Sequence, residues 1–329
     1  MYKRQLFALL LLLGVSVMTV YSASHQSLDQ LSRLGVRIGL GLVLMLVMAR
    51  IPPRIYQFWS PWLFGVGLAL LFAVELFGHV GKGAQRWLDL GFIRFQPSEI
   101  MKLAVPMMAA WYLAQRALPP RPLDVLATLA LVLVPMGLIM LQPDLGTSLL
   151  VGAAGIFVLL LAGLSWRYIA GGLAALAAII PVMWNFVMHD YQRQRVMTLL
   201  DPDADPLGTG YHIIQSKIAI GSGGVFGKGW LNSTQSNLSF LPEGHTDFIF
   251  AVFAEEFGLI GVLLLLALYL FIVMRGLVIA VNAPSMYGRL LAGSLSLSFF
   301  VYVFVNTGMV TGLLPVVGVP LPLFSYGGT

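Results

Sequence analysis

The segment LPEGHTDFIFAVFAEEFG, residues 241–258, places one histidine and four carboxylates beside a run of apolar residues. Carboxylates and imidazoles transfer protons, and carboxylates also hold divalent cations. Asp247 is our candidate for such chemistry, with His245 beside it, because ionisable residues at membrane depth are costly and usually functional. For Glu255 and Glu256 an equal alternative is that they only complement the dipole at a helix N-terminus.

The residues before this segment carry positive charges that suit an anionic ligand. The motif HDYQRQR contains Arg193 and Arg195, and the glycine-rich motif IIQSKIAIGSGGVFGKGW contains Lys217. The motif also contains Lys228, but it is not a Walker A motif, because Ser222 stands at the first required glycine and Gly229 stands where a Ser or Thr must follow the lysine. Glycine N–H groups can still bind phosphate, whereas a turn packed against the membrane is the structural alternative.

Three further motifs contain charged residues that could bind a ligand or have a structural role. In GAQRWLDLG, Arg86 and Trp87 suit a phosphate and a sugar, or else an ordinary membrane interface. In QPSEIMKLA, Glu99 and Lys102 are three residues apart on one helix face, within pairing distance. They either bind substrate or form a structural ion pair. Asp144 in QPDLGTS lies in a tight turn before a helix, so it has a functional role or else caps that helix.

The composition defines the kind of elements that must position these residues. Hydrophobic residues make up 58% of the 329 residues, charged residues only 10%, and the mean hydropathy is +0.87. These values lie outside the range of soluble domains and predict an all-α polytopic integral membrane protein. The chain has no cysteine, which excludes disulfides, thiol catalysis and cysteine-ligated zinc.

Apolar runs long enough to cross a bilayer, which takes about 20 helical residues, predict nine transmembrane helices. They lie near residues 5–22, 34–49, 59–78, 99–115, 124–141, 147–163, 166–187, 247–274 and 287–311. The first run follows Lys3 and Arg4 and resembles a signal peptide, but we favour a retained anchor because eight spans follow.

The short loops between the runs define an orientation. With the N-terminus in the cytoplasm, that side receives nine basic residues and one acidic residue, as the positive-inside rule requires. The net charge of +5 therefore reflects topology and not a nucleic-acid partner.

This orientation places the longest polar segment on the outer face. Residues 188–246 form a loop of 59 residues there, so we expect the function to face outward. Residues 312–329, LLPVVGVPLPLFSYGGT and its preceding glycine, have too many prolines and glycines for a lipid-facing helix and predict an irregular segment. We treat residues 1–329 as a single membrane domain.

Several long motifs then amount to a resemblance. The motifs are GAQRWLDLG, QPDLGTS, DPLGTGYHIIQSKIAIGSGG, LPEGHTDFIFAV and LLPVVGVPLPL. They look like motifs of the SEDS family of peptidoglycan polymerases and occur in the same order along essentially the whole chain. The motifs are most similar to the elongation branch of that family. The family has a tenth helix after SYGG, whereas this sequence ends at Thr329, so either the sequence is a fragment or the last helix is lost. With nine spans we expect the C-terminus outside and one wall of the family's cavity missing.

The resemblance implies a bacterial glycosyltransferase of the inner (cytoplasmic) membrane that polymerises lipid II on the periplasmic face during cell elongation. It implies a class B penicillin-binding protein as transpeptidase partner, within a complex that includes MreB, MreC and MreD.

The resemblance also implies roles for individual residues. It places the essential catalytic aspartate on Asp247 through the motif HTDFIF. Arg86, Trp87, Glu99 and Lys102 match positions in the family's outer cavity, and Arg193 and Arg195 match its large loop. With Lys217 and His245, these residues form our set of substrate-binding candidates.

We expect Asp247 to take the proton from the acceptor's sugar hydroxyl, whose oxygen displaces undecaprenyl pyrophosphate with inversion. Basic side chains, or a divalent cation (Mg or Mn) held by Asp247, would offset the charge on the leaving group. No other cofactor is expected.

Two other functions remain open on the sequence alone. A lipid II flippase would place its ionisable groups near the membrane midplane between inverted repeats, and the sequence shows no such repeat. A catalytically silent scaffold for cell-wall enzymes would need no carboxylate directed into a lipid-accessible cavity.

Overall fold

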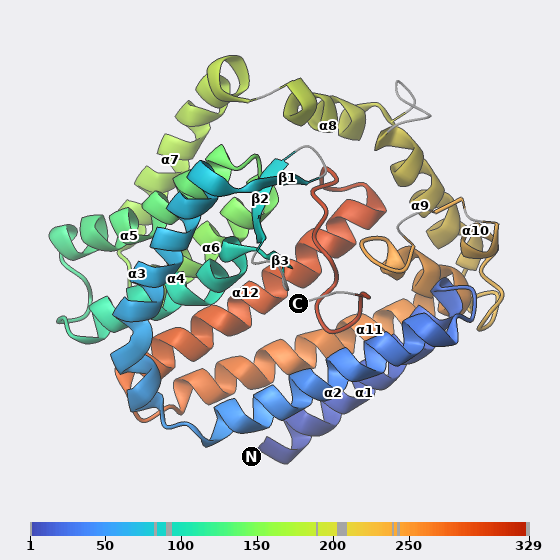
Figure 1. Ribbon diagram of the computed structural model, residues 1–329, viewed down its shortest axis with the longest axis horizontal. Coiled ribbons are helices and arrows are strands. Elements are labelled where there is room, and N and C mark those ends of the chain that lie inside the picture. The colour runs from blue at the N-terminus through green and yellow to red at the C-terminus, as the bar shows by residue number, and fades with distance from the viewer. Residues whose placement is uncertain are drawn as a thin grey trace. The chain divides into compact units, whose positions relative to one another are not determined.

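The computed structural model describes residues 2–81, 84–89, 94–188, 190–202, 209–238, 240–241 and 244–326 (Figure 1). Almost all of its regular structure is helical. The helices are α1 (Tyr2–Ala23), α2 (Leu28–Arg50), α3 (Pro53–Phe77), α4 (Pro97–Ala114), α5 (Pro122–Leu141), α6 (Leu145–Leu161), α7 (Trp166–Val182), the π-helix η1 (Met183–Val187), α8 (Asp190–Leu200), α9 (Thr209–Gly223), α10 (Thr234–Asn237), α11 (Ile249–Val281) and α12 (Met286–Thr311).

Every predicted span corresponds to a helix. Within the described residues, seven helices are long and apolar enough to cross a membrane, and together they confirm the all-α membrane class. The two other spans correspond to α4, which contains Glu99 and Lys102, and α6, which has 17 residues. Helix α11 was expected at 247–274 but begins at Ile249 and continues to Val281.

Local sequence signals explain where several helices begin. Helices α3, α4 and α5 each have proline in their first turn, where its missing N–H costs nothing. Helix α6 begins after Asp144, whose carboxylate accepts a hydrogen bond from the Thr147 N–H at 3.1 Å. The predicted capping role of Asp144 is therefore present.

Three short strands, which the sequence did not lead us to expect, follow α3. They are β1 (His79–Gly81), β2 (Ala84–Asp89) and β3 (Arg94–Phe95), arranged antiparallel in the order β1-β2-β3. Trp87 on β2 pairs with His79 on β1.

The chain forms two compact units. The first contains residues 1–46, 173–272 and 300–329, and the second contains residues 47–172 and 273–299. The assignment of residues 1–329 to a single domain stays a prediction.

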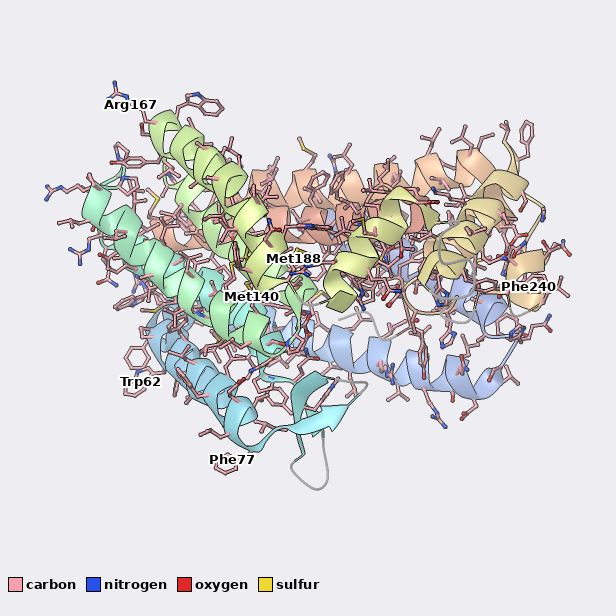
Figure 2. The ribbon with its side chains drawn as sticks, turned by 90° about the horizontal axis from the view of Figure 1, so that it is seen from above. Trp62, Phe77, Met140, Arg167, Met188 and Phe240 are labelled. Atoms are coloured by element: carbon pink, nitrogen blue, oxygen red, sulfur yellow. The ribbon has the colours of Figure 1, made fainter. Side chains whose placement is uncertain are left out.

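In the second unit, helices α3 to α6 pack around a shared apolar core that includes Leu71, Met101 and Val132. Small residues allow the close approach, because a Cβ at Gly67 would lie 2.4 Å from the Met101 sulfur. Trp62 and Phe77 project outward from α3 in Figure 2 and are 63% and 78% exposed. This exposure is expected of side chains that face lipid.

In the first unit, α1 is tied to the chain's later elements. The Ser16 hydroxyl donates to the Phe324 carbonyl at 2.8 Å, and the Trp230 indole donates to the Met18 carbonyl at 3.1 Å. The Ser216 hydroxyl of α9 donates to Val310 of α12 at 2.8 Å. We expected residues 188–246 to form a loop, but α8, α9 and α10 lie within this segment, and α9 packs on a spanning helix.

The segment from residue 312 to 326 consists of turns and extended stretches, as its prolines and glycines predict. It is nevertheless well packed, with Leu321 and Phe324 fully buried. The Tyr269 hydroxyl of α11 donates to the Pro322 carbonyl at 2.8 Å. Irregular backbone is tolerated at this depth because protein surrounds it.

Candidate functional site

Asp247 lies in the turns of residues 244–248 that lead into α11, and it is partly exposed. Its carbonyl accepts a hydrogen bond from the Asn306 side chain of α12 at 2.9 Å. Its carboxylate lies against the irregular segment, since Oδ2 is 3.5 Å from the Cβ position at Gly318. The fold thus places the carboxylate at the junction of α11, α12 and the irregular segment.

His245 is held by the same segment and has a cation nearby. Its carbonyl accepts from the Tyr326 N–H at 2.9 Å, and the two rings meet edge-on at 5.8 Å. The Arg37 guanidinium of α2 lies 4.7 Å from the centre of the Tyr326 ring, within the range of a cation–π interaction.

Our sequence analysis missed Arg37. The signal was present, because this arginine lies inside the apolar run 34–49, where an ionisable residue indicates function.

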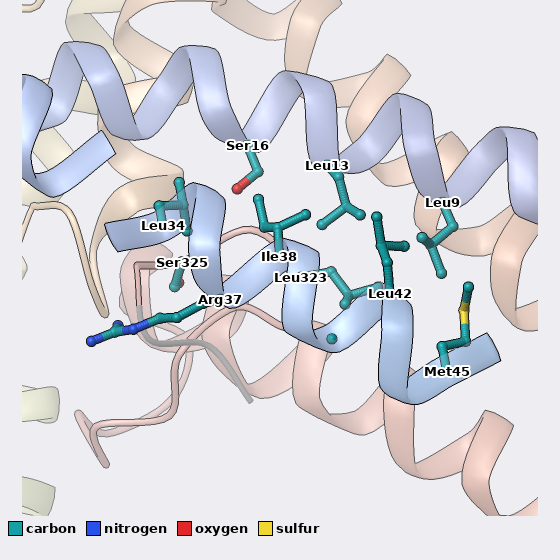
Figure 3. A pocket seen from close by; sticks show the side chains of 11 residues that line it. Leu9, Leu13, Ser16, Leu34, Arg37, Ile38, Leu42, Met45, Leu323 and Ser325 are labelled. Atoms are coloured by element: carbon teal, nitrogen blue, oxygen red, sulfur yellow. The ribbon is translucent and has the colours of Figure 1, made fainter. Parts of the chain in front are cut away.

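An apolar pocket of about 350 Å³ lies between α1, α2 and residues 323–325. Figure 3 shows Arg37 and Ser325 at one end of the pocket and Leu9 and Met45 at the other. Its walls are mostly leucine and isoleucine, so this pocket offers an apolar surface that ends at a cation.

Helix α9 brings two further ionisable residues into the first unit. The His212 ring stacks on Phe248, the neighbour of Asp247, with 5.7 Å between ring centres. The exposed Lys217 side chain lies across Gly312 at the end of α12. Sequence analysis selected Lys217 but not His212, because a histidine on an amphipathic helix gives no specific signal.

The two predicted arginines of the polar loop lie on α8. The Arg193 guanidinium donates to the Asn185 carbonyl of η1 at 3.2 Å. Arg195 is partly exposed two residues further along the same helix. Asp247, His245, Lys217 and both arginines therefore belong to the first unit.

The other four candidates belong to the second unit. Trp87 is 38% exposed on β2, and the side chain of Arg86 lies outside the described residues. The Lys102 amine is 2.7 Å from the Glu99 carboxylate, so the ion pair proposed as the structural alternative is present. Both side chains remain partly exposed, which leaves them accessible to a ligand.

The glycine motif uses its N–H groups within the protein. Gly227 donates to the Gly223 carbonyl at 2.8 Å, Lys228 to Glu255 at 3.0 Å, and Gly229 to Glu256 at 2.9 Å. These three groups are therefore not presented to a phosphate, and the alternative of a packed turn holds for this part of the motif.

The donor set near Asp247 does not form a metal site by itself. Within the described part of the chain, no group of three or more His, Asp or Glu side chains is arranged to hold a metal ion. Mg²⁺ and Mn²⁺ are commonly held by one or two carboxylates together with water and substrate phosphates, so Asp247 by itself would supply one ligand of such a site. The divalent cation therefore stays a prediction.

The fold defines the class to which this chain belongs, a multi-pass α-helical membrane protein with ionisable groups gathered at the end of a spanning helix. A model of the FtsW/RodA/SpoVE family, described as "Cell cycle protein", matches residues 3–329. The chain belongs to this family, which is the SEDS family that its motifs resemble.

Individual relatives cover nearly the whole chain. It is 59% identical over 324 residues to "Peptidoglycan glycosyltransferase MrdB" of Escherichia coli K12, covering 98% of this chain and 88% of the relative. It is 38% identical over 343 residues to "Probable peptidoglycan glycosyltransferase FtsW" of Idiomarina loihiensis, covering 100% of this chain and 83% of the relative.

Solved structures show the same fold. A chain of a peptidoglycan synthase complex, solved to explain the structural coordination of polymerization and crosslinking, matches with a TM-score of 0.83 and 33% identity, covering 98% of this chain and 91% of that one. The Thermus thermophilus rod shape determining protein RodA matches with a TM-score of 0.73 and 31% identity, covering 98% and 89%.

Proposed function

We propose that this chain is a peptidoglycan glycosyltransferase that polymerises lipid II on the outer face of the bacterial inner membrane during cell elongation. The observation that carries the proposal is the 59% identity, over 98% of the chain, to a relative named for this activity. The site is compatible with that chemistry, because a partly exposed carboxylate stands at the end of a spanning helix in a unit that also holds several cations.

In the proposed mechanism, Asp247 acts as the general base. Its carboxylate takes the proton of the acceptor's sugar hydroxyl as that oxygen forms a bond to the donor's anomeric carbon. The bond from this carbon to the pyrophosphate oxygen breaks, and undecaprenyl pyrophosphate leaves with the electron pair. Attack from the opposite side inverts the anomeric centre.

The other residues have supporting roles in this proposal. Arg37, Arg193, Arg195 and Lys217 supply positive charge for the pyrophosphate, which becomes more negative as the bond breaks. The pocket between α1 and α2 has an apolar length and a cationic end, which is the chemistry of an isoprenoid chain followed by phosphate. Arg86, Trp87, Glu99, Lys102 and His245 are proposed to contact the sugars and phosphates.

We further propose a class B penicillin-binding protein as the partner that crosslinks the product, within an assembly containing MreB, MreC and MreD. The similarity to a chain of a peptidoglycan synthase complex, in which polymerization and crosslinking are coordinated, supports this partner class.

The test is lipid II polymerisation by the purified protein with its class B partner. Asp247→Ala should lower the rate by about 10² to 10⁴, the usual contribution of a general base. The matched control is Asp29→Ala, which removes a 70%-exposed carboxylate from α2 and should leave the rate unchanged.

Different results would change the proposal in defined ways. A loss well beyond about 10⁴-fold would assign Asp247 to substrate positioning or cation binding. Absence of glycan strands from the wild-type protein, while labelled lipid II crosses liposome membranes, would overturn the transferase and favour a flippase.

A further inference from the structure

Asn306, in the last turns of α12, is fully buried and joins two distant parts of the chain. Its Nδ2 donates to the Asp247 carbonyl at 2.9 Å and to the Val319 carbonyl at 2.7 Å. Both partners are acceptors, so only the amide nitrogen can satisfy them and the orientation of the amide is chemically determined.

The other half of this amide shows which contacts matter. Asn306 Oδ1 is buried and has no hydrogen-bond partner among the described residues. An unsatisfied buried acceptor is unfavourable, so an asparagine at this position is explained by its two donated hydrogen bonds. An aspartate of the same shape would place an oxygen against two carbonyl oxygens.

These hydrogen bonds determine where the Asp247 carboxylate lies. They fix the Asp247 backbone against residues 318–319, where Gly318 has φ +71°. A Cβ at Gly318 would lie 3.5 Å from Asp247 Oδ2 and would fill the space beside the carboxylate. Asn306 holds the backbone, and the glycine leaves one side of the carboxylate open.

We infer that Asn306 is a positioning residue for Asp247, and that Gly318 keeps the space beside the Asp247 carboxylate open. The inference rests on the proposed function, in which Asp247 is the base. Asn306 acts through the Asp247 backbone and makes no contact with the reacting atoms. Its effect is therefore expected in kcat and not in KM, because a displaced base leaves ground-state binding intact.

The test measures kcat and KM for lipid II polymerisation by the protein with its class B partner. Asn306→Asp keeps the side-chain shape and removes both donors, and it should lower kcat by about 10²-fold with KM unchanged, as expected for a base displaced by about 1 Å. The matched control is Asn282→Ala, since the exposed Asn282 side chain donates to the Val278 carbonyl one turn back in its own helix. This control should retain wild-type kcat.

A second pair of variants separates positioning from folding. Gly318→Ala should also lower kcat, because its Cβ would fill the space beside the carboxylate; thermal unfolding is measured in parallel, since alanine is strained at the positive φ of Gly318. Combined with Asp247→Ala, Asn306→Asp should lower the residual rate no further, because its effect passes through the missing carboxylate.

Several outcomes would overturn the inference. Wild-type kcat in Asn306→Asp would do so, as would a kcat loss that only matches the loss of folded protein in thermal unfolding, or a further loss in the double variant. The proposed function fails separately, if Asp247→Ala alone retains activity.

Discussion

Glu255 is fully buried in α11, and its carboxylate accepts hydrogen bonds from the loop before it. The shortest of these hydrogen bonds come from the Lys228 amine at 2.6 Å, the Ser233 hydroxyl at 2.6 Å, and the N–H and hydroxyl of Thr234 at 3.0 and 2.6 Å. From the sequence we considered that Glu255 either complements the dipole of its helix or takes part in the chemistry, and neither alternative describes this role. The carboxylate holds a loop in place.

Lys228→Met should destabilise the protein, because it removes the charged donor from a carboxylate that stays buried. Hydrogen bonds to charged groups contribute about 1.5–3 kcal/mol, and we expect a loss of this size in the free energy of unfolding. The control is Arg33→Met, which breaks an exposed ion pair with Asp29 worth about 1 kcal/mol or less.

Unfolding of both variants in detergent, followed by circular dichroism, gives the comparison. Equal stabilities for the two variants would show that the buried carboxylate does not depend on Lys228.

At the scale of elements, the loop of residues 223–229 packs on a kink in α11. Gly258 at the kink has φ 65° and ψ −167°, outside the helical region. The Leu259 N–H consequently donates to the Gly224 carbonyl at 3.0 Å instead of to its own helix. Glycine is required at both contacting positions. A Cβ at Gly258 would lie 2.3 Å from the Gly227 nitrogen, and a Cβ at Gly227 would lie 2.1 Å from the Glu256 carbonyl oxygen.

Gly258→Ala should therefore detach this loop from α11. The backbone conformation of Gly258 is essentially restricted to glycine and costs another residue about 1–3 kcal/mol, and the contact with Gly227 adds to that. Limited proteolysis of the purified protein should show faster cleavage within residues 223–231. Gly221→Ala is the control, because Gly221 is helical with open space around it and alanine there should be neutral or stabilising by about 0.5–1 kcal/mol. Unchanged cleavage in Gly258→Ala would contradict this account of the kink.

A second feature at this scale is that α1 and α11 are joined at the same loop. The Ser22 hydroxyl of α1 donates to the Glu256 carboxylate, which also accepts from the Leu231 N–H at 3.1 Å. Ser22 and Glu256 are 234 positions apart in the chain. The carboxylates of residues 255 and 256 thus assemble α1, the glycine-rich loop and α11 into one structure.

At the scale of the whole molecule, the proposed function depends on orientation. Positive residues gather in the short connections on one side of the spans, and Arg167 at the start of α7 is one of them (Figure 2). By the positive-inside rule we expect these connections in the cytoplasm and residues 188–246 outside. An enzyme with this topology meets lipid-linked sugars only after their transfer to the outer leaflet.

The absence of cysteine allows a direct test of this topology. Asn232→Cys, in the polar loop, should react with a membrane-impermeant maleimide in intact spheroplasts. Asn282→Cys, between α11 and α12, should react only after permeabilisation. Both asparagines are exposed, so accessibility to the reagent differs only by side of the membrane. The reverse labelling pattern would place Asp247 in the cytoplasm and remove the basis of the proposed function.

The sequence by itself determined the class of protein, the positions of the spans and the candidate aspartate. Span assignment succeeds because the bilayer demands unbroken apolar runs, which are a local property of the chain. The helices within residues 188–246 were not predicted, because they are too polar to be recognised as spans and are held by contacts with distant segments. The strands β1 to β3 were missed because strands of two to six residues carry little periodicity.

Only the tertiary structure decided which residues meet at Asp247. Asn306 is 59 residues away, and nothing in its local sequence indicates that its amide would hold the Asp247 backbone. The same holds for Gly318 and for Arg37 beside Tyr326. It also holds for the glycine motif, whose N–H groups had two possible partners until the fold supplied carbonyls of α9 and α11. The physical reason is that hydrogen bonds and close packing depend on positions in space, which a pattern of neighbouring residues does not contain.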